Sequence, residues 1–171
     1  MNRPQPHEYP EWGAQYINLV DQDDVLVLLE KQSQEFPEFL NNFIEKADFA
    51  YAPGKWTLKE LAGHMVDTER VLSYRLMCFA RGETSPLPGF EEDDYVKNAH
   101  FADRSLLSIG EEFSLLRRAN QYLFNSLNET ELSRIGIASG RPISTRAILF
   151  VMAGHVIHHT KIIKERYADV V

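Results

Sequence analysis

Apolar residues recur every three to four positions in four long stretches of the chain. These stretches cover about residues 21–45, 57–82, 103–127 and 144–167. Such spacing places the apolar side chains along one face of an α-helix. Four amphipathic segments of this length predict an all-α four-helix bundle. We expect a kink or a short break at Pro37 in the first segment, because proline removes a backbone hydrogen-bond donor.

Residues at the ends of these segments support the helical interpretation. Thr57 and Glu60 match a capping box, in which each side chain accepts a hydrogen bond from the backbone of the other residue. Gly82 suits the position just after a helix, because glycine tolerates a left-handed backbone. Ser144 suits the N-cap of the fourth helix.

The segments between the predicted helices differ in length and composition. Residues 1–20 contain three prolines, and we expect them to form an arm packed on the bundle, within one domain spanning residues 1–171. Residues 83–102 form a long connection between the second and third helices, with an acidic run at residues 91–94. A connection of this length often has a function or covers a site. Residues 136–143 predict a turn region or a small hairpin.

Composition excludes several classes of protein. The chain has 171 residues, 44% hydrophobic and 25% charged, which fits one globular domain. The formal net charge is −7 and no basic cluster stands out, so we expect neither nucleic acid nor a membrane as a partner. Cys78 is the only cysteine, which excludes an intramolecular disulfide and a cysteine-based zinc site. No segment resembles a signal peptide or a membrane span, so we expect a cytoplasmic protein.

Two histidines lie in the apolar stripe of the fourth predicted helix. His155 and His159 share this stripe with Ile148, Met152 and Ile162. Side chains four residues apart on a helix are neighbours, so the two imidazoles can bind one metal ion. Burying imidazoles among aliphatic side chains without partners would be costly. The pair is therefore either satisfied by hydrogen bonds in the core or shares a cation.

A third histidine, His64, faces the bundle or its edge from the second predicted helix. If the second and fourth helices are neighbours, His64 can meet His155 and His159 around one ion. Three imidazoles that leave a coordination position open are typical of catalytic metal sites. Asp67, three residues after His64, could accept the free N–H of a ligating imidazole, or it could be a solvated carboxylate.

Other residues near the stripes have two possible roles. His158 is rotated off the stripe and is either a surface residue or a neighbour of the ligands. His158 or an acid of residues 91–94 could close the metal shell. Asn120 could set helix register or face the metal cavity. Arg75 and Arg166 could reach an anionic ligand, or could extend their charged ends into water.

In three segments the chain resembles the DinB-like (DinB/YfiT) superfamily. The segments are YAPGKWTLKELAGHMVDTER around His64, PLPGFEEDDYV in the long connection, and AGHVIHHTKII around His155 and His159. The resemblance implies a four-helix bundle with a long second connection, which is often a homodimer. It also implies a divalent metal held by His64, His155 and His159, for which we expect zinc or nickel.

The resemblance and the histidines leave three functions open. The first is a metal-dependent transferase that joins a low-molecular-weight thiol, such as bacillithiol or mycothiol, to a small electrophilic substrate. The second is a metal-dependent hydrolase, in which the ion activates a water molecule. The third is a non-enzymatic, stress-related bundle whose metal is structural.

Overall fold

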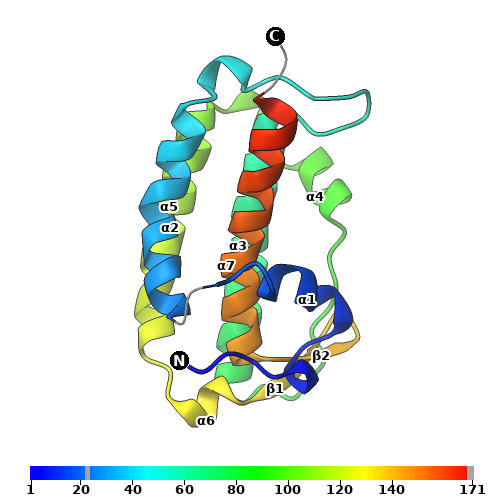
Figure 1. Cartoon of the computed structure of the whole chain (residues 1–171). Coiled ribbons are helices and arrows are strands. Elements are labelled where there is room, and N and C mark those ends of the chain that lie inside the picture. The colour runs from blue at the N-terminus through cyan, green and yellow to red at the C-terminus, as the bar shows by residue number, and fades with distance from the viewer. Residues whose placement is uncertain (22–23, 169–171) are drawn as a thin grey trace.

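Four long helices form the body of the protein, as Figure 1 shows. The structure is a computed structural model that describes residues 1–21 and 24–168. The long helices are α2 (Val25–Asn41), α3 (Leu58–Ala80), α5 (Leu106–Asn125) and α7 (Thr145–Ile162). The predicted all-α four-helix bundle is confirmed.

The order of the helices around the bundle differs from their order in the chain. α2 packs against α5 and α7, and α3 packs against the same two helices. The first two long helices, α2 and α3, therefore lie at opposite corners, although they follow each other in the sequence. This arrangement makes α3 and α7 neighbours, which brings the helices that carry the three histidines together.

Shorter elements precede, connect or follow the four long helices along the chain. They are η1 (Pro6–Glu8), α1 (Glu11–Ile17), η2 (Ile44–Lys46), α4 (Glu92–Asn98), η3 (Phe101–Asp103), α6 (Glu129–Leu132), β1 (Ile135–Ala138), β2 (Arg141–Ser144) and a final π-helical turn, η4 (Ile163–Tyr167). β1 and β2 form an antiparallel hairpin, which confirms the hairpin predicted near residues 136–143. None of the described helices is long and apolar enough to cross a membrane.

The predicted helix signals occupy the expected positions. The backbone N–H of Thr57 donates to Glu60 Oε2 at 2.7 Å, and the N–H of Glu60 donates to Thr57 Oγ1 at 3.3 Å. Ser144 Oγ accepts from the N–H of Ala147 at 3.0 Å. Gly82 follows α3 with φ of 85°, the left-handed conformation that glycine adopts at little cost.

Three expectations about the helices need correction. The first long helix begins at Val25, with Asp24 as its N-cap, and ends at Asn41 rather than near residue 45. The start expected for it includes residues 22–23, which lie outside the described residues. The helix runs through Pro37, so the short break that was one of the two alternatives there is wrong. The third helix begins at Leu106 rather than near residue 103, because Ser105 provides its N-cap.

The remaining segments also contain more helix than the sequence pattern predicts. The 83–102 connection carries the short helix α4, and the N-terminal arm carries α1. Both helices lie outside the bundle beside α3 and α7 (Figure 1). They are seven residues long, too short for a clear apolar periodicity, and they are stabilised by packing on the bundle.

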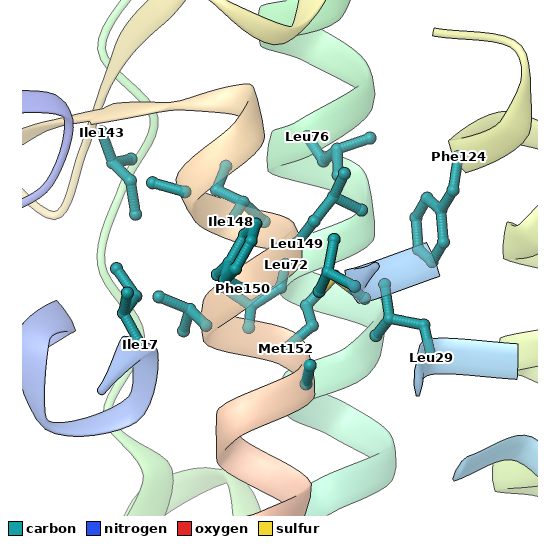
Figure 2. Close-up of a cluster of buried hydrophobic side chains, with 14 of the residues drawn as sticks. Ile17, Leu29, Leu72, Leu76, Phe124, Ile143, Ile148, Leu149, Phe150 and Met152 are labelled. Atoms are coloured by element: carbon teal, nitrogen blue, oxygen red, sulfur yellow. The ribbon is translucent and has the colours of Figure 1, made fainter. Parts of the chain in front are cut away.

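Two apolar clusters form the core, one toward each end of the bundle. Figure 2 shows the first, where Ile148, Leu149 and Met152 of α7 meet Leu72 and Leu76 of α3. The second cluster lies around the first half of α3 and the first half of α5. Between the clusters, each long helix contributes buried polar residues, among them Gln32, Glu69, Arg117 and His155.

Candidate metal centre

The three predicted histidines converge at one point between α3 and α7. His64 Nε2 lies 3.2 Å from His155 Nε2, and His159 Nε2 lies 3.0 Å from the same atom. One nitrogen from each ring lies within 4.8 Å of the others, and all three side chains are buried. In residues 1–21 and 24–168, this is the one group of histidine, cysteine or acidic side chains that could hold a metal ion.

A glycine precedes two of the three histidines, and another segment packs closely on each glycine. Gly154 precedes His155, and a Cβ on Gly154 would overlap the carbonyl oxygen of Tyr16 in α1. Gly63 precedes His64, and a Cβ there would overlap the ring of Phe101. The absence of a side chain at both glycines lets these outer segments lie directly on the helices beside the site.

Aromatic side chains wall the histidine cluster on two sides. The Trp56 ring lies 4.9 Å from that of His64, measured between centroids. The Tyr16 ring meets His155 edge to face at 5.5 Å. These rings cover two sides of the cluster and shield it in part from water.

Burial keeps the three imidazoles uncharged at neutral pH. It lowers the pKa of His64 to about 4, although the carboxylates of Glu92 and Asp93 oppose that shift. It lowers the pKa of His159 to about 3, with a further contribution from the His64 ring. The pKa of His155 lies well below its ordinary value, first because of burial and then because of the other two histidines. Neutral imidazoles have the free lone pairs that metal binding requires.

The donor geometry fits a divalent cation better than it fits a hydrogen-bonded cluster. A ring nitrogen of a neutral imidazole offers either one proton or one lone pair. His155 Nε2 faces two other Nε2 atoms, so hydrogen bonding cannot satisfy both contacts well. Two nitrogens bound tetrahedrally to one zinc ion lie roughly 3.3 Å apart, close to the spacing of these atoms. The Nδ1 atom of His159 is buried without a partner, so all the polar interactions of that ring are at Nε2.

The other predicted candidates lie outside the histidine cluster. Asp67 makes no hydrogen bond to a histidine among the described residues; burial raises its pKa, while Arg70 and Arg104 lower it. The residue that approaches His64 is Thr68, whose Oγ1 lies 3.5 Å from His64 Nδ1. Thr68 follows His64 by four residues on the same helix, so the sequence spacing alone could have predicted that the two side chains are neighbours.

The candidate fourth ligands also remain separate from the three histidines. His158 packs edge to face on His159 at 5.0 Å and on Tyr16 at 5.4 Å, and it is not part of the converging group. Glu92 and Asp93 of α4 act on His64 through their charge, but neither joins the group. No fourth side chain among the described residues closes the site.

A cavity of about 280 Å³ opens directly onto His159. Its wall includes Trp56, Leu61 and Ile162, with Asp93 and Lys55 as its charged members. The cavity contains both an apolar surface and a carboxylate next to the histidine cluster. A larger cavity, of about 480 Å³, lies between α2 and α7, but none of the three histidines lines it.

Comparison with known proteins places the chain in a family. A sequence profile of the DinB superfamily matches residues 28–163, most of the chain. The chain belongs to the DinB superfamily. No curated protein sequence is similar enough to it to count as a match.

A solved member of this fold supports the architecture. YfiT from Bacillus subtilis, described as a probable metal-dependent hydrolase with an unusual four-helix bundle topology, superimposes with a TM-score of 0.73. The match covers 96% of this chain and 91% of YfiT, at 18% sequence identity. The TM-score shows that the two proteins share the fold. An identity this low carries nothing further over to this chain.

Proposed function

We propose that the protein is a metal-dependent hydrolase whose ion is held by His64, His155 and His159. The observation that carries this proposal is the convergence of three neutral Nε2 donors next to a cavity with an open side. A divalent ion held by neutral ligands keeps its full charge and supplies a hydroxide-like nucleophile near neutral pH. The description of YfiT as a probable metal-dependent hydrolase supports the same reaction class.

Asp93 is the residue we propose as the proton acceptor. It lines the cavity together with His159, and its charge acts on His64. A carboxylate at this place can accept a proton from a nucleophile and later return it to a leaving group. Trp56 and Leu61 would bind the apolar part of a substrate, because they line the same cavity as His159.

A metal-dependent thiol transferase is the second candidate. Lys55 at the same cavity favours an acidic low-molecular-weight thiol, and the uncompensated charge of the ion would favour a thiolate. In this case Asp93 would accept the thiol proton, and the apolar wall would bind the electrophile.

The two candidates differ in whether a thiol is required. Protein loaded with zinc or nickel would be assayed on ester and amide substrates without thiol. A parallel assay would use bacillithiol, mycothiol, glutathione or coenzyme A with a chlorobimane. Thiol-free hydrolysis that is lost in His159→Ala and retained in His7→Ala supports the hydrolase. Transfer that requires both metal and thiol supports the second candidate. Activity that survives both chelation and His159→Ala rules out the metal mechanism.

Asp93→Asn separates the role of this carboxylate from metal binding. We expect full metal content and a lower maximal rate by about 10²-fold. An unchanged rate at full metal content would remove Asp93 from the mechanism without affecting the assignment of the ligands.

A further inference from the structure

Arg75 is a buried arginine that the proposed reaction does not use. It lies on α3, and only 6% of the surface of the residue is exposed. Its Nη2 atom donates to the carbonyl oxygen of Pro88 at 2.7 Å and to Ser139 Oγ at 3.0 Å. The guanidinium carbon also lies 5.8 Å from the centroid of the Phe90 ring. Two segments, the 83–102 connection and the β1–β2 hairpin, therefore hold the group in place.

The charge of Arg75 differs from that of the other buried arginines because no carboxylate pairs with it. Arg117 pairs with Glu69 at 2.7 Å, and Arg146 pairs with Glu129 at 2.8 Å. For Arg75, no ion pair is found across the described part of the chain, and no hydrogen bond there uses its Nε or Nη1 atom. A buried charge without a counter-ion is costly. The fold thus maintains a guanidinium whose natural partner would be an external anion.

Arg75 lines a cavity of about 300 Å³ with strongly aromatic walls. The walls are formed by Tyr74 of α3, Phe90 of the connection and Tyr95 of α4, with the aliphatic side chains of Val71 and Leu87 between them. Leu87 is fixed by hydrogen bonds of its backbone to Ile137 and Ser139, at 2.8 and 3.2 Å. The hairpin therefore holds this side of the cavity in place without a ligand.

This cavity is separate from the metal centre. It shares no lining residue with the cavity beside His159. Arg75 lies eleven residues after His64 on the same helix, which corresponds to roughly 16 Å along the axis. The two cavities lie on either side of α4, which contributes Asp93 to one and Tyr95 to the other.

We propose that this cavity is a second binding site that takes a small aromatic carboxylate. The guanidinium of Arg75 pairs with the carboxylate, through donors that the protein leaves free. The rings of Tyr74, Phe90 and Tyr95 pack around the flat apolar body of the ligand. A bare anion would leave these rings without a partner, and a neutral aromatic compound would leave the guanidinium without one.

The test is a titration of metal-free wild-type protein with benzoate, followed by NMR of the arginine Nε–H and aromatic signals. Acetate matches the charge without the ring, benzamide matches the ring without the charge, and inorganic phosphate tests for a general anion site. We expect saturable shifts at Arg75, Tyr74 and Tyr95 with benzoate, at a Kd at least tenfold below that of each other compound. No saturable shift, or acetate or phosphate binding as tightly as benzoate, overturns the proposal. Because no metal is present, this result is independent of the proposed hydrolase activity.

Variants distinguish a ligand-binding arginine from a structural one. Arg75→Met should abolish benzoate binding with at most a small change in the melting temperature, because removal of a charge without a counter-ion offsets the lost hydrogen bonds to Pro88 and Ser139. Arg118→Met, at an exposed arginine of α5, is the matched control and should bind as wild type. Tyr95→Leu, at a half-exposed ring of α4 that lines the cavity, should weaken benzoate several-fold and leave acetate unchanged. Equal benzoate binding by Arg75→Met and wild type, or a large fall in the melting temperature of Arg75→Met, contradicts the proposal.

Discussion

Arg117 donates hydrogen bonds of 2.7 Å from Nε and Nη2 to the two carboxylate oxygens of Glu69. Both side chains are almost fully buried, at 0% and 3% exposure. Gln32 accepts a further hydrogen bond from Arg117 at 3.1 Å and donates one to the carbonyl of Ala153 at 2.9 Å. The pair therefore connects α5 and α3 directly. Through Gln32 it also reaches α7 at Ala153, which lies two residues before His155.

Breaking this ion pair should destabilise the protein far more than replacing it. Arg117→Met alone leaves Glu69 buried without a counter-ion, and we expect a loss of about 3–5 kcal/mol in the free energy of unfolding. The double variant Glu69→Leu/Arg117→Met should recover most of that loss, because two apolar side chains pack together without a charge. Urea denaturation of wild type, Glu69→Leu, Arg117→Met and the double variant measures this coupling. Additive losses in the double variant would contradict it.

The fold is largely predictable from the sequence, because apolar periodicity and capping residues are local signals. The Thr57–Glu60 capping box and the Ser144 N-cap both occur as expected. The ends of the first helix and the presence of α4 were not predictable in this way. The proline at position 37 is tolerated because tertiary packing outweighs the loss of one backbone hydrogen bond.

The candidate site is predictable only in part, because spacing within a helix identifies some of its residues and others come from separate segments. Helical spacing places His155 and His159 together, and packing of α3 on α7 adds His64. Tyr16, Trp56 and Asp93 reach the site from separate segments of the chain, so no spacing within one helix identifies them. Glu69 and Arg117 are missed because charged residues in a helical pattern are usually exposed, and only their mutual contact explains their burial.

Gly154 should tolerate no larger residue, because α1 lies directly on it. We expect Gly154→Ala to displace α1 and to lower the free energy of unfolding by about 1–3 kcal/mol, as overpacking does elsewhere. Gly110→Ala on α5 is the matched control, since a Cβ there would make ordinary contacts with Pro37 and Leu40. Alanine favours a helix over glycine by up to about 1 kcal/mol, so this control should be as stable as wild type or more stable. Equal effects of the two substitutions in urea denaturation would rule out the close contact with Tyr16 as the cause.

Metal content should depend on each of the three histidines. Wild-type protein should bind about one divalent ion per chain, while His64→Ala, His155→Ala and His159→Ala should each lose most of it. His7→Ala, at an exposed histidine of η1, should retain the wild-type content. Zinc or nickel at a hundredfold excess over Kd should add about 2.7 kcal/mol to the stability of wild-type protein. Elemental analysis and thermal denaturation provide the measurements, and unchanged content in His155→Ala and His159→Ala would refute the site.

The metal-free protein should lose stability as the pH falls from about 6.5 to about 4. An unfolded histidine has a pKa of 6.5, whereas the folded values are about 4 for His64 and about 3 for His159, and lower than ordinary for His155. Between these limits the unfolded chain binds more protons than the folded chain, so stability rises with pH. Each of the three groups contributes a slope of up to about 1.4 kcal/mol per pH unit.

A variant that lacks the imidazoles isolates this contribution from that of the carboxylates. The triple substitution His64→Gln, His155→Gln and His159→Gln should flatten the stability profile between pH 4 and 6.5, relative to metal-free wild type. His7→Gln, at an exposed histidine of η1, is the matched substitution outside the cluster. Urea denaturation at half-unit pH steps, with a chelator present throughout, gives the comparison. Parallel profiles for wild type and the triple variant would show that the three imidazoles can take up protons in the folded protein, which the burial of their converging Nε2 atoms should prevent.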